Sequence, residues 1–427
     1  MDRQAMPPWL IPMVYVGLAV VVGVVFPRIE QAYFPAYTLD LSVASAQAYL
    51  SAAASGMMAL TGIVFAMAFV MVQFSAIAYS PRLVLWFMRD RILFHSLGVF
   101  SATFIYALFT LAWVDRGGSG KVPPFSSLLV ALMIVVSMLL FSRLMQRLGD
   151  LQITNVLHLL GDQGRSVIHE MFRPLEDTPA SLHPSRGASV RKLGPVTQTV
   201  KYSGKPRTIA KFDHALLVAL AERARATIEM TNAVGDALLE GAVLIRVHDA
   251  EAPLPEGALL RAVRLARERT FEQDPKYPIR LLVDVAIKAL SPAINDPTTA
   301  VQTIDQLEDL LRRLGASELD VGYLSDSNGV LRLLFPTPTW DDYLALAFDE
   351  IRQFGSSSVQ VMRRLRAALL GLLESLSSAE RVDAVRRYLK HLDQVVDASQ
   401  FDIDDQRMAR QEDPQGIGLT RRRADTN

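Results

Sequence analysis

Hydrophobic residues concentrate in four long runs in the first third of the chain. The runs cover residues 9–26, 42–81, 92–114 and 122–144, and Arg143 is the only charged residue within them. About 20 apolar residues suffice for a helix to cross a bilayer core, so each run predicts a membrane span. A secretory signal peptide is the alternative for the first run, but Pro27-Arg28 does not resemble a small-residue cleavage site, which favours a retained helix.

The second run is the longest and has its own pattern of small side chains. Six small or polar residues and one phenylalanine recur along it at spacings of three and four, which places all seven on one face of a helix. They are Ala52, Ser55, Ala59, Gly62, Ala66, Phe69 and Gln73. Small side chains let a second membrane helix approach closely. The pattern therefore predicts a helix-packing face or, if several copies surround an axis, the lining of a pore.

Basic residues between the runs predict the orientation of the spans. One side of the membrane would hold seven of them: Arg3, Arg82, Arg89, Arg91, Arg143, Arg147 and Arg165. The other side would hold Arg28, Arg116 and Lys121. Because cytoplasmic loops carry the excess of Lys and Arg, we expect both termini in the cytoplasm. Arg82, Arg89 and Arg91 would then surround the inner vestibule of a pore and favour anions there.

The rest of the chain has the pattern of a soluble α+β domain. We expect helices at residues 213–225, 255–270, 278–290, 297–314, 340–354, 357–376 and 379–398, and strands at 226–232, 234–247, 318–324 and 330–335. The predicted organisation is a four-helix transmembrane domain (1–145), a connecting helix and linker (146–180), a small α+β module (181–250), a mainly helical cytoplasmic domain with a β-hairpin (251–399) and a disordered tail (400–427). The fold class is thus an α-helical membrane domain plus an α+β cytoplasmic domain.

The strand pair of the small module resembles the hairpin barrel of biotinyl and lipoyl carrier domains. The resemblance lies in Val-Gly-Asp at 234–236 followed by Glu-Gly at 240–241, flanked by alternating apolar residues. Those carriers modify a lysine on a tight hairpin, and no equivalent Met-Lys-Met occurs here. The resemblance therefore concerns a β-barrel-like fold only.

The turn SPAINDPTTA, residues 291–300, admits two interpretations. Asp296 before Pro297 has the residue types of a helix N-cap and a first helical position. A possible anion site would use the helix N-terminus with this set of residues: Asn295, Asp296, Thr298, Thr299, Arg269 and Arg280. A tight connection between packed helices is the favoured alternative, because Asp at the cap already supplies the negative charge.

Composition and motifs exclude several functional classes. Residues 151–427 hold 35 Lys and Arg against 38 Asp and Glu, so no basic face indicates a nucleic-acid partner. The chain has no Cys, which excludes disulfides, thiolate metal sites and a cysteine nucleophile. No HExxH, GxSxG or GxGxxG motif in a strand–helix context is present. We therefore expect no catalytic residues, no metal and no cofactor.

Two stretches resemble the signature blocks of a bacterial family of predicted membrane proteins of unknown function. They are residues 80–111 (SPRLVLWFMRDRILFHSLGVFSATFIYALFTL) and 269–314 (RTFEQDPKYPIRLLVDVAIKALSPAINDPTTAVQTIDQLEDLLRRL). The resemblance implies a multi-pass protein of the prokaryotic inner membrane with the organisation described above. It implies no substrate.

Three functional hypotheses follow from these observations. The first is a homo-oligomeric ion channel or small-solute pore in the lipid bilayer, gated by its cytoplasmic domain. The alternative is a membrane-anchored sensor or scaffold that binds a cytoplasmic protein or metabolite without transport activity. An enzyme ranks last, because the sequence contains no catalytic constellation.

Overall fold

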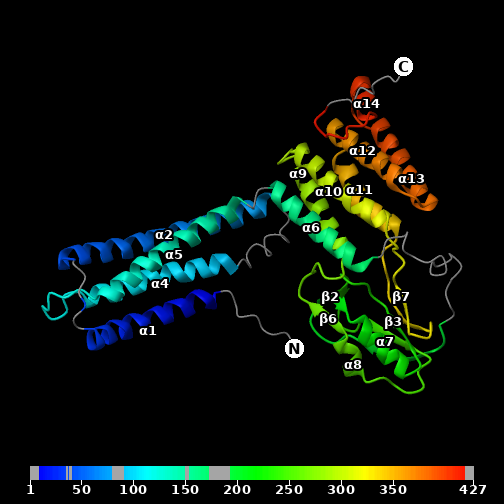
Figure 1. Cartoon of the computed structure of the whole chain (residues 1–427). Coiled ribbons are helices and arrows are strands. Elements are labelled where there is room, and N and C mark those ends of the chain that lie inside the picture. Colours follow the sequence, from blue (N-terminus) through cyan, green and yellow to red (C-terminus); the bar gives the residue numbers. More distant parts are fainter. Residues whose placement is uncertain are drawn as a thin grey trace. The chain divides into compact units, whose positions relative to one another are not determined.

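The chain divides into two compact units, Met1–Gln152 and Ile153–Asn427. The computed structural model describes residues 9–34, 37, 41–78, 91–149, 153–172 and 193–418 (Figure 1). Each unit has its own hydrophobic core, and they are described in turn.

The N-terminal unit consists, in its described part, of four helices. They are α1 (Leu10–Tyr33), α2 (Val43–Ala78), α4 (Arg91–Trp113) and α5 (Pro124–Gly149). Each is long and apolar enough to cross a membrane, which confirms the four predicted spans. The first helix extends beyond the predicted run at residues 9–26, because α1 continues through Pro27 to Tyr33. A proline inside a membrane helix is tolerated where neighbouring helices restore the lost backbone contacts.

Helix α4 packs against α1, α2 and α5 and forms the centre of this unit. Glycines permit its closest approach to α1. A Cβ atom on Gly23 of α1 would lie 2.7 Å from the Phe109 Cβ, and one on Gly98 of α4 would lie 2.6 Å from the Tyr15 ring. Small residues at helix contacts are the usual means of membrane-helix association, since lipid provides no hydrophobic drive between helices.

The C-terminal unit contains two small sheets. The larger has the order β1 (Val196–Lys201), β5 (Val243–His248), β3 (Thr227–Met230), β8 (Leu331–Leu334), β7 (Tyr323–Ser325), with β3 and β8 parallel and the other pairs antiparallel. The smaller is antiparallel, in the order β4 (Ala237–Leu238), β2 (Arg207–Phe212), β6 (Val263–Ala266). Two short helices lie between the strands along the chain, α7 (His214–Arg223) and α8 (Glu256–Arg261). The fold class is thus confirmed as four apolar helices followed by a mixed helix and sheet domain.

The sheets differ from the predicted elements in three places. The expected helix at 255–270 is wrong, because α8 ends at Arg261 and β6 follows, with Val263 buried and Arg264 exposed in strand alternation. The hairpin of β7 and β8 pairs through β8 with β3, so it extends the sheet of the preceding module. The strands of the predicted carrier-like hairpin are divided between both sheets, with β4 in one and β3 and β5 in the other.

A group of helices completes the C-terminal unit. They are α6 (Ile153–Met171), α9 (Lys276–Ala289), α10 (Pro297–Gly315), α11 (Trp340–Phe354), α12 (Val359–Ser375), α13 (Ala379–Asp397) and α14 (Ile403–Ala409). Helix α10 contacts α6, α9, α11 and α12 and lies at the centre of this group (Figure 1). The predicted helices after residue 270 are confirmed, each within a few residues of its expected ends. The predicted connecting helix and linker at 146–180 overlaps the end of α5, at Gly149, and the whole of α6, which belongs to the C-terminal unit; residues 150–152 and 173–192 lie outside the described residues.

The predicted disordered tail is folded as far as residue 418. Asp413 is fully buried, and its carboxylate accepts hydrogen bonds from the backbone N–H groups of Gly416 and Gly418. Gln360 and Arg363 of α12 donate to the carbonyl oxygens of the same two glycines, at 2.6 and 2.9 Å. These contacts hold the segment on α12. Residues 419–427, the remainder of the predicted tail, lie outside the described residues.

Candidate functional site

The seven predicted pore-lining or helix-packing residues of α2 are all exposed in the chain. The largest of them, Phe69, is 65% exposed. The exposed residues are Ala52, Ser55, Ala59, Gly62, Ala66, Phe69 and Gln73. The buried residues of α2 are Ala46, Leu50, Ala53, Ala54, Met57 and Val64, which pack in clusters with α4 and α5. By helical period these two sets lie on opposite sides of α2. The small-residue face is therefore not a contact within the described part of the N-terminal unit.

Glycine geometry gives the same result for this face. A Cβ atom added at Gly56 or Gly62 would meet no heavy atom within 4 Å. By contrast, Gly23 and Gly98 lie against aromatic side chains of a neighbouring helix. The glycines of α2 thus leave room for a close neighbour that the described residues of the chain do not supply.

An open groove of about 570 Å³ lies beside this face, between α2 and α4. Helix α2 contributes Ser51, Ala54, Ser55, Met58 and Ala59, and α4 contributes Phe104, Leu108 and Leu111. Ser55 and Ala59 belong to both the groove and the small-residue face. The lining is mostly apolar, and its polar side-chain groups are the hydroxyls of Ser51 and Ser55. It therefore suits an apolar helix or an acyl chain.

The three predicted vestibule arginines stay predictions. Arg82 and Arg89 lie outside the described residues, and only the backbone of Arg91 is described, as the first residue of α4.

Glu30, which no sequence motif marked, is buried between α1 and α5. Its side chain is 3% exposed. Its carboxylate accepts hydrogen bonds from the N–H groups of Phe125 and Ser126, at 2.7 and 3.0 Å, and from the Ser126 hydroxyl at 2.6 Å. Glu30 therefore supplies a negative charge to the N-terminus of α5, which has no acidic residue in its own first turn. Its position as the single glutamate in residues 1–152 was a signal available in the sequence.

The SPAINDP turn is a capped connection between α9 and α10. The Asp296 carboxylate accepts from the Thr299 N–H at 3.1 Å and from the Thr299 hydroxyl at 2.6 Å, and Pro297 begins α10. Asn295 has a φ of 48°, which lets the chain reverse between the helices. The carboxylate thus already occupies the helix N-terminus that an anion would use. Thr298 forms the first turn of α10 beside it.

The two arginines grouped with this turn bind carboxylates elsewhere. Arg269 pairs with Asp274, which is buried, and its guanidinium lies 5.9 Å from the centre of the Tyr277 ring. Arg280 pairs with Asp284 and Glu350. The hydrogen bond with Glu350 raises the pKa of Arg280 and lowers that of Glu350. The structure therefore shows a carboxylate partner for each arginine, and an anion role for the turn stays a prediction.

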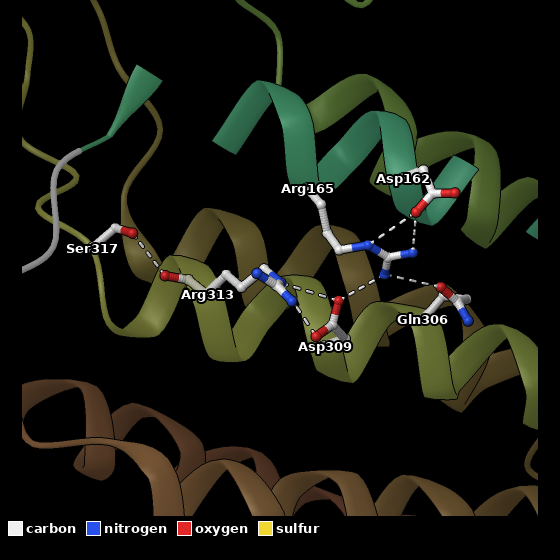
Figure 2. Close-up of polar contacts among 6 residues, drawn as sticks. All are labelled: Asp162, Arg165, Gln306, Asp309, Arg313 and Ser317. Atoms are coloured by element: carbon white, nitrogen blue, oxygen red, sulfur yellow. Dashed lines mark hydrogen bonds and ion pairs between the residues drawn. The ribbon is translucent and has the colours of Figure 1, made fainter. Parts of the chain in front are cut away.

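Helix α6 meets α10 through close glycine contacts and through an ion-pair cluster, which Figure 2 shows. A Cβ atom at Gly161 would lie 2.2 Å from the Gln306 Oε1, and one at Gly164 would lie 2.7 Å from Leu310 Cδ1. Arg165 donates to Asp162 on its own helix at 2.7 Å and to Asp309 on α10 at 2.8 Å (Figure 2). These contacts make α6, the first helix after the membrane segments, an integral part of the C-terminal unit.

Charge stabilises this contact. Burial lowers the pKa of Arg165, but hydrogen bonds to Asp162 and Asp309 outweigh it, so the pKa is raised. Burial raises the pKa of Asp309, but hydrogen bonds from Arg313 and Arg165 outweigh it and the pKa is lowered. The prediction assigned residues 146–180 to a connecting helix and linker rather than to the C-terminal domain. The signal that would have placed this helix in that domain is the apolar period of α6, whose buried residues are Val156, Leu157, Leu160, Gly161, Gly164, Val167 and Ile168.

No group of three or more His, Asp or Glu residues within the described segments is placed to hold a metal ion.

Comparison with known proteins places this architecture in a family. Residues 7–370 match the family model described as "Predicted membrane protein (DUF2254)". Relatives with 29% identity over 357 residues include the uncharacterized proteins Rv1290c of Mycobacterium tuberculosis and Mb1321c of Mycobacterium bovis. The match covers 80% of this chain and 65% of each relative, so the chain spans just under two thirds of their length. No solved structure matches the chain. The family match includes all four spans, the α6–α10 contact and the SPAINDP turn, and the chain belongs to the DUF2254 family of predicted membrane proteins.

Proposed function

We propose that this chain forms a homo-oligomeric ion channel or small-solute pore in the bacterial inner membrane, with both termini in the cytoplasm. The observation that carries the proposal is the small-residue face of α2, which is exposed and lies opposite the face that packs within the chain. Small residues on a membrane helix allow close contact with another helix. A second copy of the same chain would supply that helix.

In such an assembly the seven residues of this face would line the axis. The lining would be narrow and weakly polar from Ala52 to Ala66, constricted by Phe69, and ringed by the Gln73 amides. An apolar ring can gate a pore by dewetting, and an amide ring affects which ions pass. The side chains of both Phe69 and Gln73 are exposed, as this arrangement requires.

The α6–α10 contact supports gating by the C-terminal unit. Only residues 150–152 separate α5 from α6 in the chain. Helix α6 is held to α10 by Arg165 and by close glycine contacts. A shift of α10 would therefore move α6 with it and pull on the end of α5. No catalytic activity and no cofactor are part of this proposal.

Ion flux through purified protein in liposomes tests the proposal. We expect Phe69→Ala to raise basal flux by removing the constriction, and Gln73→Glu to shift selectivity towards cations. Ile63→Ala is the matched control, because Ile63 is exposed on α2 but lies beside the seven-residue face. Its flux should equal that of the unmodified chain.

The channel proposal would be contradicted if the unmodified protein and both variants showed no ion flux over a range of salts and pH. The membrane-anchored sensor or scaffold would then be the better description of the protein.

A further inference from the structure

Two arginines share one aromatic ring where α1 and α4 end. The guanidinium carbon of Arg28, on α1, lies 5.9 Å from the centre of the Trp113 ring, and that of Arg116, just past the end of α4, lies 4.0 Å from it. Both arginines are exposed, whereas Trp113 is half-buried. Because both distances end at the same ring, the two guanidinium groups are near neighbours, although they come from different helices.

The positive charges at this end of the bundle have no carboxylate partner within the described residues. This holds for both guanidinium groups and for Lys121, which is exposed in the α4–α5 connection. The carboxylates described here are bound elsewhere, because Glu30 is buried and caps α5, and Asp115 accepts from the Gly120 N–H within its own loop. Asp40, in the α1–α2 connection, lies outside the described residues.

The arrangement of the two guanidinium groups suits an anion with several oxygens. Like charges held side by side repel each other, and an anion between them replaces this repulsion with two attractions. Phosphate oxygens match the planar fork of a guanidinium, which donates two N–H groups at a time. Contact with the ring of Trp113 restricts both side chains before a ligand arrives, which lowers the entropy cost of binding.

The position of these residues along their helices indicates the source of the phosphate. Trp113 is the last residue of the apolar helix α4, and Arg28 lies in the last two turns of α1. The exposed rings of Tyr33 and Tyr37 follow Arg28 in the chain. Trp and Tyr gather at the headgroup level of a bilayer, and an arginine near the end of a span extends its charge to that level. The phosphates at this level belong to phospholipids.

We propose that Arg28, Trp113 and Arg116 form a binding site for the headgroup of an anionic phospholipid. The phosphate oxygens accept hydrogen bonds from both guanidinium groups. Lys121 adds a third positive charge close by, since its carbonyl oxygen accepts from the Asp115 N–H beside Arg116. A zwitterionic headgroup carries an ammonium group that these cations repel, so the site prefers an anionic headgroup such as that of phosphatidylglycerol. By the predicted orientation, the lipid belongs to the outer leaflet of the inner membrane.

Arginines that merely reach the membrane surface make a different prediction. Each would contact whichever headgroup is nearest, so anionic and zwitterionic lipids with the same acyl chains would bind alike. A built site binds the anionic lipid more tightly and loses affinity when either arginine is removed. This difference concerns neither ion flux nor self-association, so the inference stands apart from the proposed channel.

Native mass spectrometry of the full-length protein, titrated with phosphatidylglycerol or phosphatidylcholine, tests the site. We expect tighter binding of phosphatidylglycerol, and Arg28→Gln and Arg116→Gln should each weaken it about fivefold, the factor typical of one cation at an anionic surface. Arg143→Gln is the matched control, because Arg143 is also an exposed arginine without a described carboxylate partner but lies far along α5 from Pro124. It removes the same charge and should leave this affinity unchanged.

Three results would overturn the proposal. The first is equal affinity for the two lipids, and the second is unchanged affinity for phosphatidylglycerol when both arginines are replaced by glutamine. The third is displacement of the lipid by an equal concentration of inorganic phosphate, which would make free phosphate the ligand.

A double lysine variant separates charge from altered structure. Arg28→Lys combined with Arg116→Lys keeps both charges but loses the planar fork, so it should bind phosphatidylglycerol more weakly than the unmodified chain and more tightly than the double glutamine variant. Equal binding by the two double variants would show that charge does not hold the lipid, and would also contradict the site.

Discussion

Polar side chains hold helices together in both units, but the chemistry differs. In the N-terminal unit, the buried contact between α4 and α5 is a hydroxyl pair, Thr103 and Ser137, 3.2 Å apart. In the C-terminal unit, Arg364 of α12 is 5% exposed and donates to Asp305 and Glu308 of α10 at 2.6 Å each. The first contact uses neutral groups, and the second uses a guanidinium and two carboxylates.

The environment of each unit explains the difference. One hydroxyl of the Thr103–Ser137 pair donates to the other, which donates in turn to a backbone carbonyl of its own helix, Val99 or Met133, so neither depends on water. Hydrocarbon cannot solvate a polar group, so self-satisfied hydroxyls suit a membrane helix. In the C-terminal unit, Asp305 is half exposed and keeps its contact with water while it binds Arg364. Networks of charged side chains therefore have a lower desolvation cost at the edge of this core, where they keep contact with water.

The topology of the spans gives an all-or-none test of this comparison. Reporter fusions after residues 35, 85, 118 and 170 should be exterior, cytoplasmic, exterior and cytoplasmic, because the bias of Lys and Arg orients the spans. An exterior signal at residue 170 would place the ion-pair-rich unit outside and contradict the proposed gating.

Removal of Arg364 should have the largest effect on stability. Arg364→Met keeps much of the side-chain volume but leaves Asp305 without its cation and leaves the nearly buried Glu308 with Arg312 alone. We expect a loss of about 3–5 kcal/mol in the free energy of unfolding, since breaking a buried ion pair leaves uncompensated charge. Chemical unfolding of the full-length chain in detergent measures it. Arg386→Met is the control, because its pair with Asp383 is exposed and should contribute at most about 1 kcal/mol. If both variants lowered the free energy of unfolding equally, burial would not decide how much an ion pair contributes to stability.

Two glycines allow a direct comparison of helix contacts in the two units. Gly164→Leu should cost about 1–3 kcal/mol, because the new side chain overlaps the buried Leu310 where α6 meets α10. Gly62→Leu meets open space, so the stability of the single chain should not fall. Its oligomeric mass in detergent should fall instead, because the leucine blocks close approach of a second copy. An unchanged mass for Gly62→Leu combined with Ala59→Leu would contradict self-association through this face.

The pair of Arg280 and Glu350 gives the smallest predicted effect, and it depends on pH. The hydrogen bond from Arg280 lowers the pKa of Glu350, so its contribution to stability is present above its ordinary pKa near 4.5 and is lost as the pH falls through the lowered value. Glu350→Gln should therefore destabilise the chain by about 1 kcal/mol at neutral pH, because the carboxylate is partly exposed. The difference should vanish in acid. Glu374→Gln is the matched control, since Glu374 is exposed, and its difference from the unmodified chain should not depend on pH.

Local sequence patterns determined the elements whose causes are local. Four apolar runs specify four membrane helices, because the bilayer acts on each segment separately. Asp296 followed by Pro297 specifies the start of α10, because the cap bonds to a residue only three positions away. Helical periodicity located most helices of the C-terminal unit for the same reason.

Tertiary structure decided which faces and side chains meet. Composition could not show that α2 packs through Leu50 and Met57 and leaves the face of Gly62 exposed, because that choice depends on the shape of α4. Strand β6 forms where helical spacing was expected, because β2, some fifty residues away in the chain, pairs with it. Glu30 finds its partners about ninety-five residues later, at the first turn of α5. These contacts depend on free energies between distant segments, and no local pattern contains them.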